Sequence, residues 1–125
     1  MKGKSPTART LAWCKTNGYT AGIVERRNPK LRFKTHDFLG VIDLIACAPA
    51  IGIVGVQATS GAHHAARMAK IEMEPRALVW LASGARLEVH SWRKGGARGE
   101  RKTWLLRRTR AFLSGDKIGW SEEGA

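Results

Sequence analysis

Two short apolar runs separated by a three-residue break constrain the fold of this chain more than any other feature. The first run spans residues 41–47 and the second spans residues 51–60, with Ala48, Pro49 and Ala50 between them. Both runs are rich in Val and Ile and are bounded by Gly or Pro, a pattern that favours buried β-strands. The break is short enough for a hairpin, so the two strands are expected to pair with each other.

Each apolar run carries one polar side chain, Asp43 in the first and Gln57 in the second. A turn centred on Ala50 places these residues opposite each other on one face of the hairpin, with Cβ atoms roughly 4.5–5.5 Å apart. An unpaired buried carboxylate is costly, so Asp43 needs a partner. A carboxylate and an amide oxygen can share a hard cation such as Mg²⁺. The alternative is a buried Asp–Gln hydrogen bond without a metal, and these two residues alone leave both options open.

The order of these features resembles the PD-(D/E)XK nuclease superfamily, whose fold is called restriction-endonuclease-like and which includes Holliday junction resolvases. Asp43 matches the metal-binding Asp of that family, and Gln57-Ala58-Thr59 matches its (D/E)-x-K, with Gln in place of the acid. Glu25 resembles the acid that many members supply from or just after their first helix. Thr59 stands where the family has lysine. Some members carry that lysine on the following helix, where this chain has Lys70.

The resemblance implies an α/β fold with an αβββαβ core, in which helices flank one mixed central sheet. It implies Mg²⁺ or Mn²⁺ held by Glu25, Asp43, the Gln57 side chain and the carbonyl of Ala58. It further implies a nuclease that hydrolyses phosphodiester bonds in structured DNA such as a Holliday junction, with Lys70 orienting the attacking water. By analogy with two-fold symmetric junctions, a homodimer would suit such a substrate.

The charge balance supports a polyanionic partner independently of any motif. The chain has 22 Lys and Arg against 10 Asp and Glu, a formal charge of +12 over 125 residues. Such a balance favours nucleic acid, most simply DNA. No run of about eighteen apolar residues is present, so no membrane span is expected, and without an amphipathic anchor a membrane surface is the less favoured partner. The two cysteines lie in apolar contexts, which favours reduced core thiols and a cytoplasmic protein.

Candidate nucleic-acid contacts fall into two groups. One is the basic stretch after Glu25, and the other is the polar start of the helix expected after the second strand. Their members are Arg26, Arg27 and Lys34 in the first group, and Thr59, Ser60, His63 and Arg67 in the second. The basic stretch can equally be a solvated loop. Asp37 is either a further metal ligand or an ordinary turn acid.

The remaining pattern predicts helices over residues 6–17, 62–73 and 76–83, and strands over 87–92 and 103–108. Residues 19–24 fit either a strand or a continuation of the first helix. In the second helix, an apolar stripe of Ala62, Ala66, Ala69 and Met73 is expected to pack on the sheet. Residues 1–113 are predicted to form one nuclease-like domain, followed by a polar, loosely ordered tail over 114–125 in which Trp120 has no assigned role.

Two other functions fit the same residues. The chain can be a nucleic-acid-binding module that has the fold without catalysis, because Thr59 lacks the charge of the family's lysine. It can also be a small basic adaptor whose partner is another protein.

Overall fold

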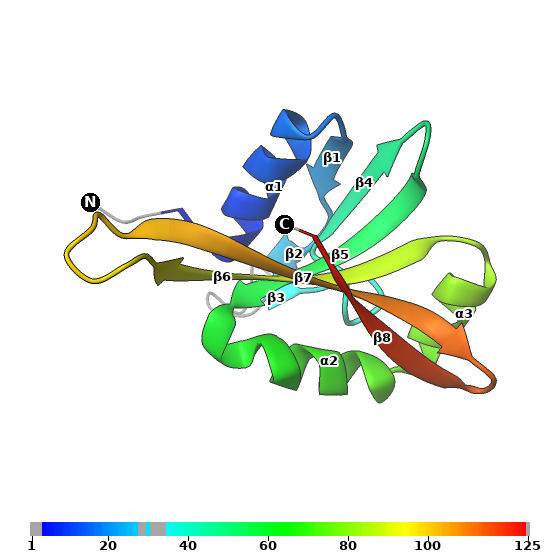
Figure 1. Cartoon of the computed structure of the whole chain (residues 1–125). Coiled ribbons are helices and arrows are strands. Elements are labelled where there is room, and N and C mark those ends of the chain that lie inside the picture. The colour runs from blue at the N-terminus through cyan, green and yellow to red at the C-terminus, as the bar shows by residue number, and fades with distance from the viewer. Residues whose placement is uncertain (1–3, 28–29, 31–34, 125) are drawn as a thin grey trace.

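The computed structural model describes residues 4–27, 30 and 35–124, and shows an α/β protein built on a mixed six-stranded sheet. The strand order is β1-β4-β5-β6-β7-β8, and the sheet is not closed. Helix α1 covers one face, whereas α2 and α3 cover the other (Figure 1). The predicted class, a mixed sheet between helices, is confirmed at this level.

The elements follow the chain in a simple order. The helices are α1 (Pro6–Thr16), α2 (His64–Glu72) and α3 (Pro75–Ala82), and a short 3-10 helix, η1 (Gly61–His63), precedes α2. The strands of the main sheet are β1 (Thr20–Ile23), β4 (Leu44–Ala48), β5 (Gly52–Ser60), β6 (Arg86–Gly95), β7 (Thr103–Ser114) and β8 (Lys117–Glu123). A separate two-stranded sheet pairs β2 (Arg26–Arg27) with β3 (Thr35–His36).

The hairpin of β4 and β5 has the register predicted from the sequence. Leu44 pairs with Val56, and the amide of Asp43 donates to the carbonyl of Val56 over 2.8 Å. This pairing places Asp43 level with Gln57. The strand begins at Leu44 and not at Val41, because a tight turn precedes it, in which Phe38 N–H donates to the carbonyl of Ile42.

Strands β5 and β6 are parallel, with Gln57 level with Val89. The connection between them runs through α2 and α3, as a parallel pair requires a crossover. The carboxyl ends of both strands therefore lie at the same edge of the sheet. That edge is also where α1 begins (Figure 1).

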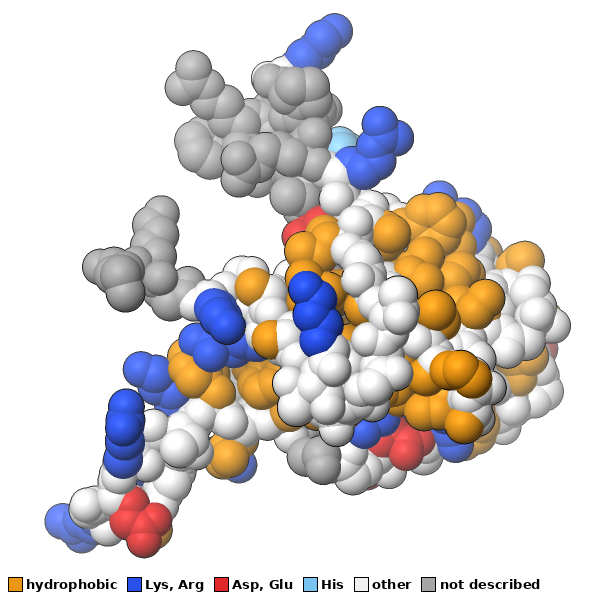
Figure 2. Space-filling model, turned by 90° about the horizontal axis from the view of Figure 1, so that it is seen from above, with side chains coloured by type: hydrophobic (Ala, Val, Ile, Leu, Met, Phe, Trp, Pro, Cys, Tyr) orange, Lys and Arg blue, Asp and Glu red, His pale blue; other side chains and the backbone are white. Residues whose placement is uncertain are grey.

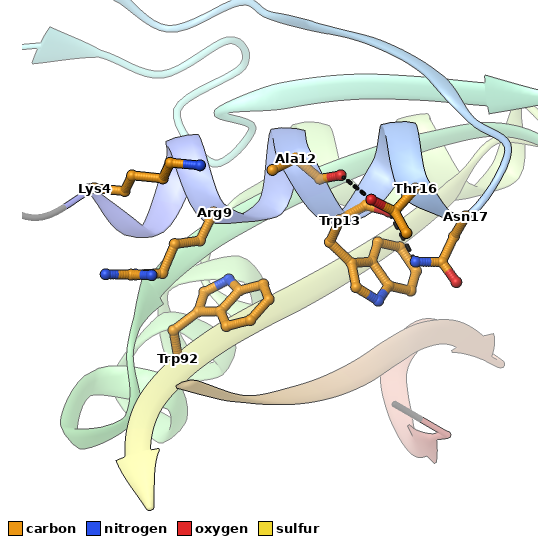
Figure 3. A pocket seen from close by; sticks show the side chains of 7 residues that line it. All are labelled: Lys4, Arg9, Ala12, Trp13, Thr16, Asn17 and Trp92. Atoms are coloured by element: carbon orange, nitrogen blue, oxygen red, sulfur yellow. Dashed lines mark hydrogen bonds between the residues drawn. The ribbon is translucent and has the colours of Figure 1, made fainter. Parts of the chain in front are cut away.

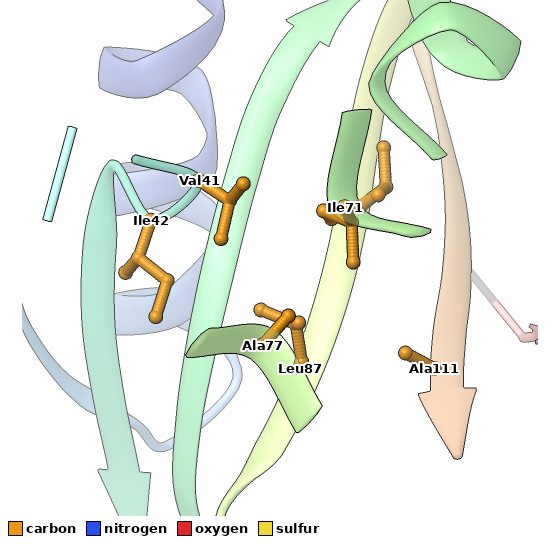
Figure 4. Packing of buried hydrophobic residues seen from close by; sticks show 7 residues of the cluster. Val41, Ile42, Ile71, Ala77, Leu87 and Ala111 are labelled. Atoms are coloured by element: carbon orange, nitrogen blue, oxygen red, sulfur yellow. The ribbon is translucent and has the colours of Figure 1, made fainter. Parts of the chain in front are cut away.

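The core has one hydrophobic cluster on each face of the sheet. On the face of α2 and α3 it contains Val41, Ile42, Ile71, Ala77, Leu87, Val89 and Ala111, most of which Figure 4 labels. On the face of α1 it contains Leu44, Val54, Val56 and Ala58, with Leu11 and Tyr19 packed against them. The two clusters fix the sheet between its helices.

The predicted packing face of the second helix is wrong. Ala62, Ala66 and Ala69 are exposed, and Met73 is 82% exposed. The buried face instead carries His64 and Ile71. Both ring nitrogens of His64 have hydroxyl partners, Ser91 and Thr109, so the imidazole is buried with its polar atoms satisfied. Ile71 buries far more apolar area than an alanine, so it displaces the alanine stripe from the core.

The first helix agrees with its prediction. The Ser5 side chain accepts a hydrogen bond from the Ala8 amide, and Gly18 follows the helix with φ of +83°. The undecided segment after it becomes β1. Among the described helices, none is long and apolar enough to cross a membrane.

The end of the chain differs from its prediction. Lys117–Glu123 forms β8, which pairs along β7 from Ser114 to Arg108, where a loose tail was expected. Trp120 of β8 packs against the core cluster, and its indole N–H donates to the Glu72 carboxylate over 3.0 Å. The cysteine prediction is half right: both thiols are free and Cys14 is buried, but Cys47 is exposed.

Candidate active site

A polar cavity of about 300 Å³ lies at the sheet edge where α1 begins, between α1 and α2. Its walls come from five parts of the chain: α1, the segment after β1, the turn before β4, β5 and α2. The lining residues are Thr7, Glu25, Asp37, Asp43, Gln57, Ala58, Arg67 and Lys70. The structure thus gathers in one cavity the predicted catalytic set of Glu25, Asp43, Gln57 and Lys70.

Three carboxyl groups meet at this cavity. One oxygen from each of Glu25, Asp37 and Asp43 lies within 4.8 Å of the others. Glu25 is brought there by its backbone, since its amide donates to the carbonyl of Asp43. Asp37 arrives by the turn that precedes β4. Three negative charges at this spacing would repel one another strongly in a half-buried site. A bound cation, or a proton shared between two of the carboxyl groups, would relieve that repulsion.

Asp43 is the most constrained of the three. Its side chain is almost fully buried, and its Oδ2 accepts hydrogen bonds from Gln57 Nε2 over 2.7 Å and from the Ala58 amide over 2.8 Å. The Asp–Gln contact expected from the hairpin is therefore present. Ala58 takes part through its N–H, while a role for its carbonyl stays a prediction.

The three acids differ in how readily they ionise. Burial, together with a hydrogen bond to Asp37, raises the pKa of Asp43 to about 8. Burial also raises the pKa of Glu25. For Asp37, burial is outweighed by hydrogen bonds from Asp43 and Lys70, which lower its pKa. The opposite directions of these two shifts favour one proton held between Asp43 and Asp37, with Asp43 the more readily protonated of the pair.

Gln57 has one polar atom without a partner. Its Nε2 donates to Asp43, but its buried Oε1 has no hydrogen-bond partner among the described residues. A buried amide oxygen left unpaired is costly. Gln57 also lines the acidic cavity, so this unpaired oxygen is a candidate ligand for a cation there.

Two basic side chains from α2 complete the cavity. Lys70 Nζ lies 3.1 Å from Asp37 Oδ2, and Arg67 Nε lies 3.5 Å from the buried hydroxyl of Thr59. The helical line through these residues was predicted to face the cleft, and both residues do line it. Thr59 supplies no charge, so among the described residues that line the cavity the positive charge comes from α2.

Three other predicted nucleic-acid contacts, Ser60, His63 and Arg26, lie outside the cavity lining. Ser60 is half-buried at the end of β5, and both His63 and Arg26 are exposed. Arg27 is placed in β2 by its backbone. Lys34 lies outside the described residues.

Sequence reasoning left Asp37 undecided, although it completes the carboxylate cluster. The only signal was its place before an apolar run, since the turn that brings it beside Asp43 is built from Phe38 to Ile42. A second polar cluster, on the α1 face, was missed altogether. There Glu88 accepts from Arg108 and lies 2.9 Å from His90, whose other nitrogen meets Thr10 of α1. All its members have partners, so it serves to dock α1, the helix that brings Thr7 to the cavity.

Comparisons with family models, with curated proteins and with solved structures found no match for this chain.

Proposed function

We propose that this protein is a divalent-metal-dependent nuclease with a restriction-endonuclease-like fold. The observation that carries the proposal is the convergence of Glu25, Asp37 and Asp43 in a cavity bordered by Arg67 and Lys70. Carboxylates beside basic groups suit a scissile phosphate, which needs both metal ligands and positive charge around it.

The donor set fits a hard cation. All its candidate ligands are oxygens, three from carboxyl groups and one from the unpartnered Oε1 of Gln57. Mg²⁺ and Mn²⁺ prefer such ligands, whereas zinc sites in proteins use nitrogen or sulfur as well. When bound, the ion would activate a water molecule and neutralise charge on the phosphate.

The chain's own residues have separate tasks in this proposal. Asp43, Asp37 and Glu25 would hold the cation, and Asp43 would do so as a carboxylate, because a metal ligand of this kind must be deprotonated. Lys70 shifts from Asp37 toward the attacking water or the phosphate. Arg67, whose Nε donates to the Thr59 hydroxyl, would use its remaining N–H groups to donate hydrogen bonds to a phosphate oxygen of the substrate backbone.

Structured DNA such as a Holliday junction is the substrate that we propose, and a homodimer would present two such cavities to a symmetric junction. The formal charge of +12 supports a polyanionic substrate.

A non-catalytic nucleic-acid-binding module is the second candidate. It is favoured by Thr59 at the position of the family's lysine and by the ion pair that engages Lys70 with Asp37. A basic adaptor for a protein partner is a third outcome of the tests below.

The deciding experiment is a cleavage panel of four-way junction, flap, duplex and single-stranded DNA, each with Mg²⁺ or Mn²⁺. Cleavage is expected for wild type and for Asp116→Asn, a control acid in the exposed β7–β8 turn. Asp43→Asn is expected to abolish cleavage and to bind DNA as well or better, since one negative charge near the phosphate is removed. Binding without cleavage in wild type would favour the module. Cleavage by Asp43→Asn would remove this site.

Lys70 has its own test in single-turnover kinetics. Lys70→Ala is expected to lower the cleavage rate at least about tenfold more than it lowers affinity, because its charge acts mainly in the transition state. Lys117→Ala is the matched control, an exposed lysine at the far end of the sheet. If Lys70→Ala lowers the cleavage rate and the affinity equally, Lys70 is a binding residue. If Arg67→Ala lowers the rate more than Lys70→Ala does, Arg67 is the catalytic cation.

A further inference from the structure

Strands β6 and β7 continue beyond the rest of the sheet as a two-stranded ribbon. Strand β5 ends at Ser60, level with Trp92, whereas β6 and β7 stay paired as far as Gly95 and Thr103. At its tip, Lys102 Nζ donates to the carbonyl of Gly96 over 3.0 Å. In Figure 1 the ribbon projects past the sheet edge on the side where α1 begins, which is also the edge of the acidic cavity.

The ribbon is strongly basic. Its described side chains include Arg93, Lys94, Arg98, Arg101 and Lys102, with Glu100 as the one acid. Figure 2 shows Lys and Arg side chains spread along this projection. Within the described part of the chain, no ion pair joins a carboxylate to Arg93, Lys94, Arg98 or Arg101. Like charges gathered in this way repel, and a polyanion would relieve that repulsion.

Trp104 links the ribbon to α1. The guanidinium of Arg9 stacks 3.7 Å from the centre of the Trp104 ring, and Lys94 Nζ lies 5.5 Å from it on the same ribbon. Stacking on an aromatic face orients a guanidinium while leaving its N–H edges available for phosphate. Arg9 and Lys4 also line the same end of a groove beside α1, next to Trp92 (Figure 3). Trp104 is therefore a positioning residue for the partly exposed guanidinium of Arg9.

We propose that this ribbon surface, made of Arg9, Lys94, Arg98, Arg101 and Trp104, binds the backbone of the duplex that flanks the cleft. The proposal rests on the proposed function, since it assumes that the cleft receives DNA. A two-stranded β-ribbon fits the width of a major groove. Contacts from Lys and Arg to phosphates position a duplex without reading its sequence.

The geometry sets a length requirement. His90 lies level with Ala58 of the cavity, and Gly95 lies five residues further along β6. At about 3.3 Å per residue this is roughly 17 Å. A duplex rises about 3.4 Å per base pair, so Gly95, the last paired residue of β6 in the ribbon, lies level with about the fifth base pair from the cleft. Flanks of about four base pairs should therefore miss the tip residues Arg98 and Arg101, which lie beyond Gly95.

The first test measures DNA affinity without divalent metal, so that cleavage does not intervene. Junctions with arms of about 4, 8 and 16 base pairs are titrated at several salt concentrations. Wild-type affinity should rise between the short and the longer arms. Arg98→Ala/Arg101→Ala should bind long arms about tenfold more weakly, with a salt slope lower by about 1.8, and short arms unchanged. Lys15→Ala/Lys117→Ala, which removes two exposed lysines outside the ribbon surface, is the charge-matched control.

A second variant set tests the role of Trp104. Arg9→Ala and Trp104→Leu should weaken long-arm binding equally, their combination should be no weaker than either, and Trp104→Phe should restore binding. Thermal melting of each variant checks that the fold is retained.

The two proposals fail separately. The ribbon surface is refuted if Arg98→Ala/Arg101→Ala loses no DNA affinity, or loses the same affinity for short and long arms. It is also refuted if the control pair loses as much affinity. None of these results would affect the proposal that the protein cleaves DNA. A length-dependent loss in a protein that cleaves no substrate would support the ribbon surface and refute the nuclease.

Discussion

Asp43 is buried in a setting that favours its protonated form, and this has a consequence for stability. Its pKa is about 8 in the fold, against an ordinary value of 3.8. A raised pKa contributes stability that is fully present below about pH 4 and is lost as the pH rises through 8. We predict that, without metal, Asp43→Asn melts higher than wild type, by about 3 °C or more at pH 8 and by much less at pH 5. Scanning calorimetry at both pH values measures this. Asp116→Asn, in the exposed β7–β8 turn, is the control. The prediction is contradicted if the advantage of Asp43→Asn over wild type fails to grow from pH 5 to pH 8.

Gln57 offers a second test at the residue scale. Gln57→Glu adds a fourth carboxylate beside Asp43, so the metal-free variant should melt lower than wild type. With metal, the added charge should reduce the Mn²⁺ concentration needed for half-maximal stabilisation by about tenfold, since a carboxylate is a stronger ligand than an amide oxygen. Melting temperature against Mn²⁺ concentration gives both quantities. Unchanged metal dependence would identify Gln57 as a hydrogen-bonding core residue.

Local spacing predicted part of the site and left the rest undecided. Asp43 and Gln57 were paired by a hairpin register that the structure confirms. Lys70 followed from helical periodicity. Asp37 was left open because its approach to Asp43 depends on the turn at Leu39 and Gly40, which have φ of 53° and 77°. A left-handed leucine is not readable from sequence patterns.

At the scale of elements, the close packing of the hairpin against α3 makes one glycine essential. A Cβ on Gly55 would lie 2.8 Å from Ile42 Cδ1 and 3.1 Å from the Trp80 ring. We predict that Gly55→Ala lowers the free energy of unfolding by about 1–3 kcal/mol through overpacking. Gly22→Ala, on the edge strand β1 with no atom within 4 Å of its added Cβ, is the control and should be neutral or stabilising. Urea denaturation compares the two, and equal stabilities would show that Ile42 repacks without cost.

The elements themselves were predictable where local signals were strong. Ser5 and Gly18 marked the ends of α1, and both act as expected. The face of α2 was mispredicted because periodicity alone weighted three alanines above His64, whose hydroxyl partners lie 27 and 45 residues further along the chain. Such long-range partners decide which side of a helix is buried, and they leave no local signal.

At the scale of the whole molecule, the last strand, β8, packs against the same hydrophobic cluster as residues from the first half of the chain. Trp120 packs beside α2 and donates to Glu72. We predict that Trp120→Ala lowers the free energy of unfolding by about 2 kcal/mol or more, whereas Trp120→Phe, which keeps most of the packing, costs about half as much. Urea denaturation measures both. If Trp120→Ala leaves the free energy of unfolding unchanged, residues 117–123 do not contribute to the stability of the core.

This strand was missed for a physical reason. Its sequence is polar and glycine-containing, so it looks like a tail, and it becomes a strand because seven consecutive residues find partners on β7. The long β7 supplies that template. An edge strand of this kind depends on pairing more than on its own apolar pattern.

The two cysteines differ sharply in chemical access. Burial raises the pKa of the Cys14 thiol to about 11, while Cys47 is exposed on β4. Because thiolates are the reactive form, a maleimide added at neutral pH should modify Cys47 and spare Cys14. Cys47 stands four residues beyond Asp43 along the chain, roughly 13 Å from the acidic cluster. The chain thus carries a natural attachment point for a single fluorophore, close enough to report on what enters the cavity and far enough to leave it open.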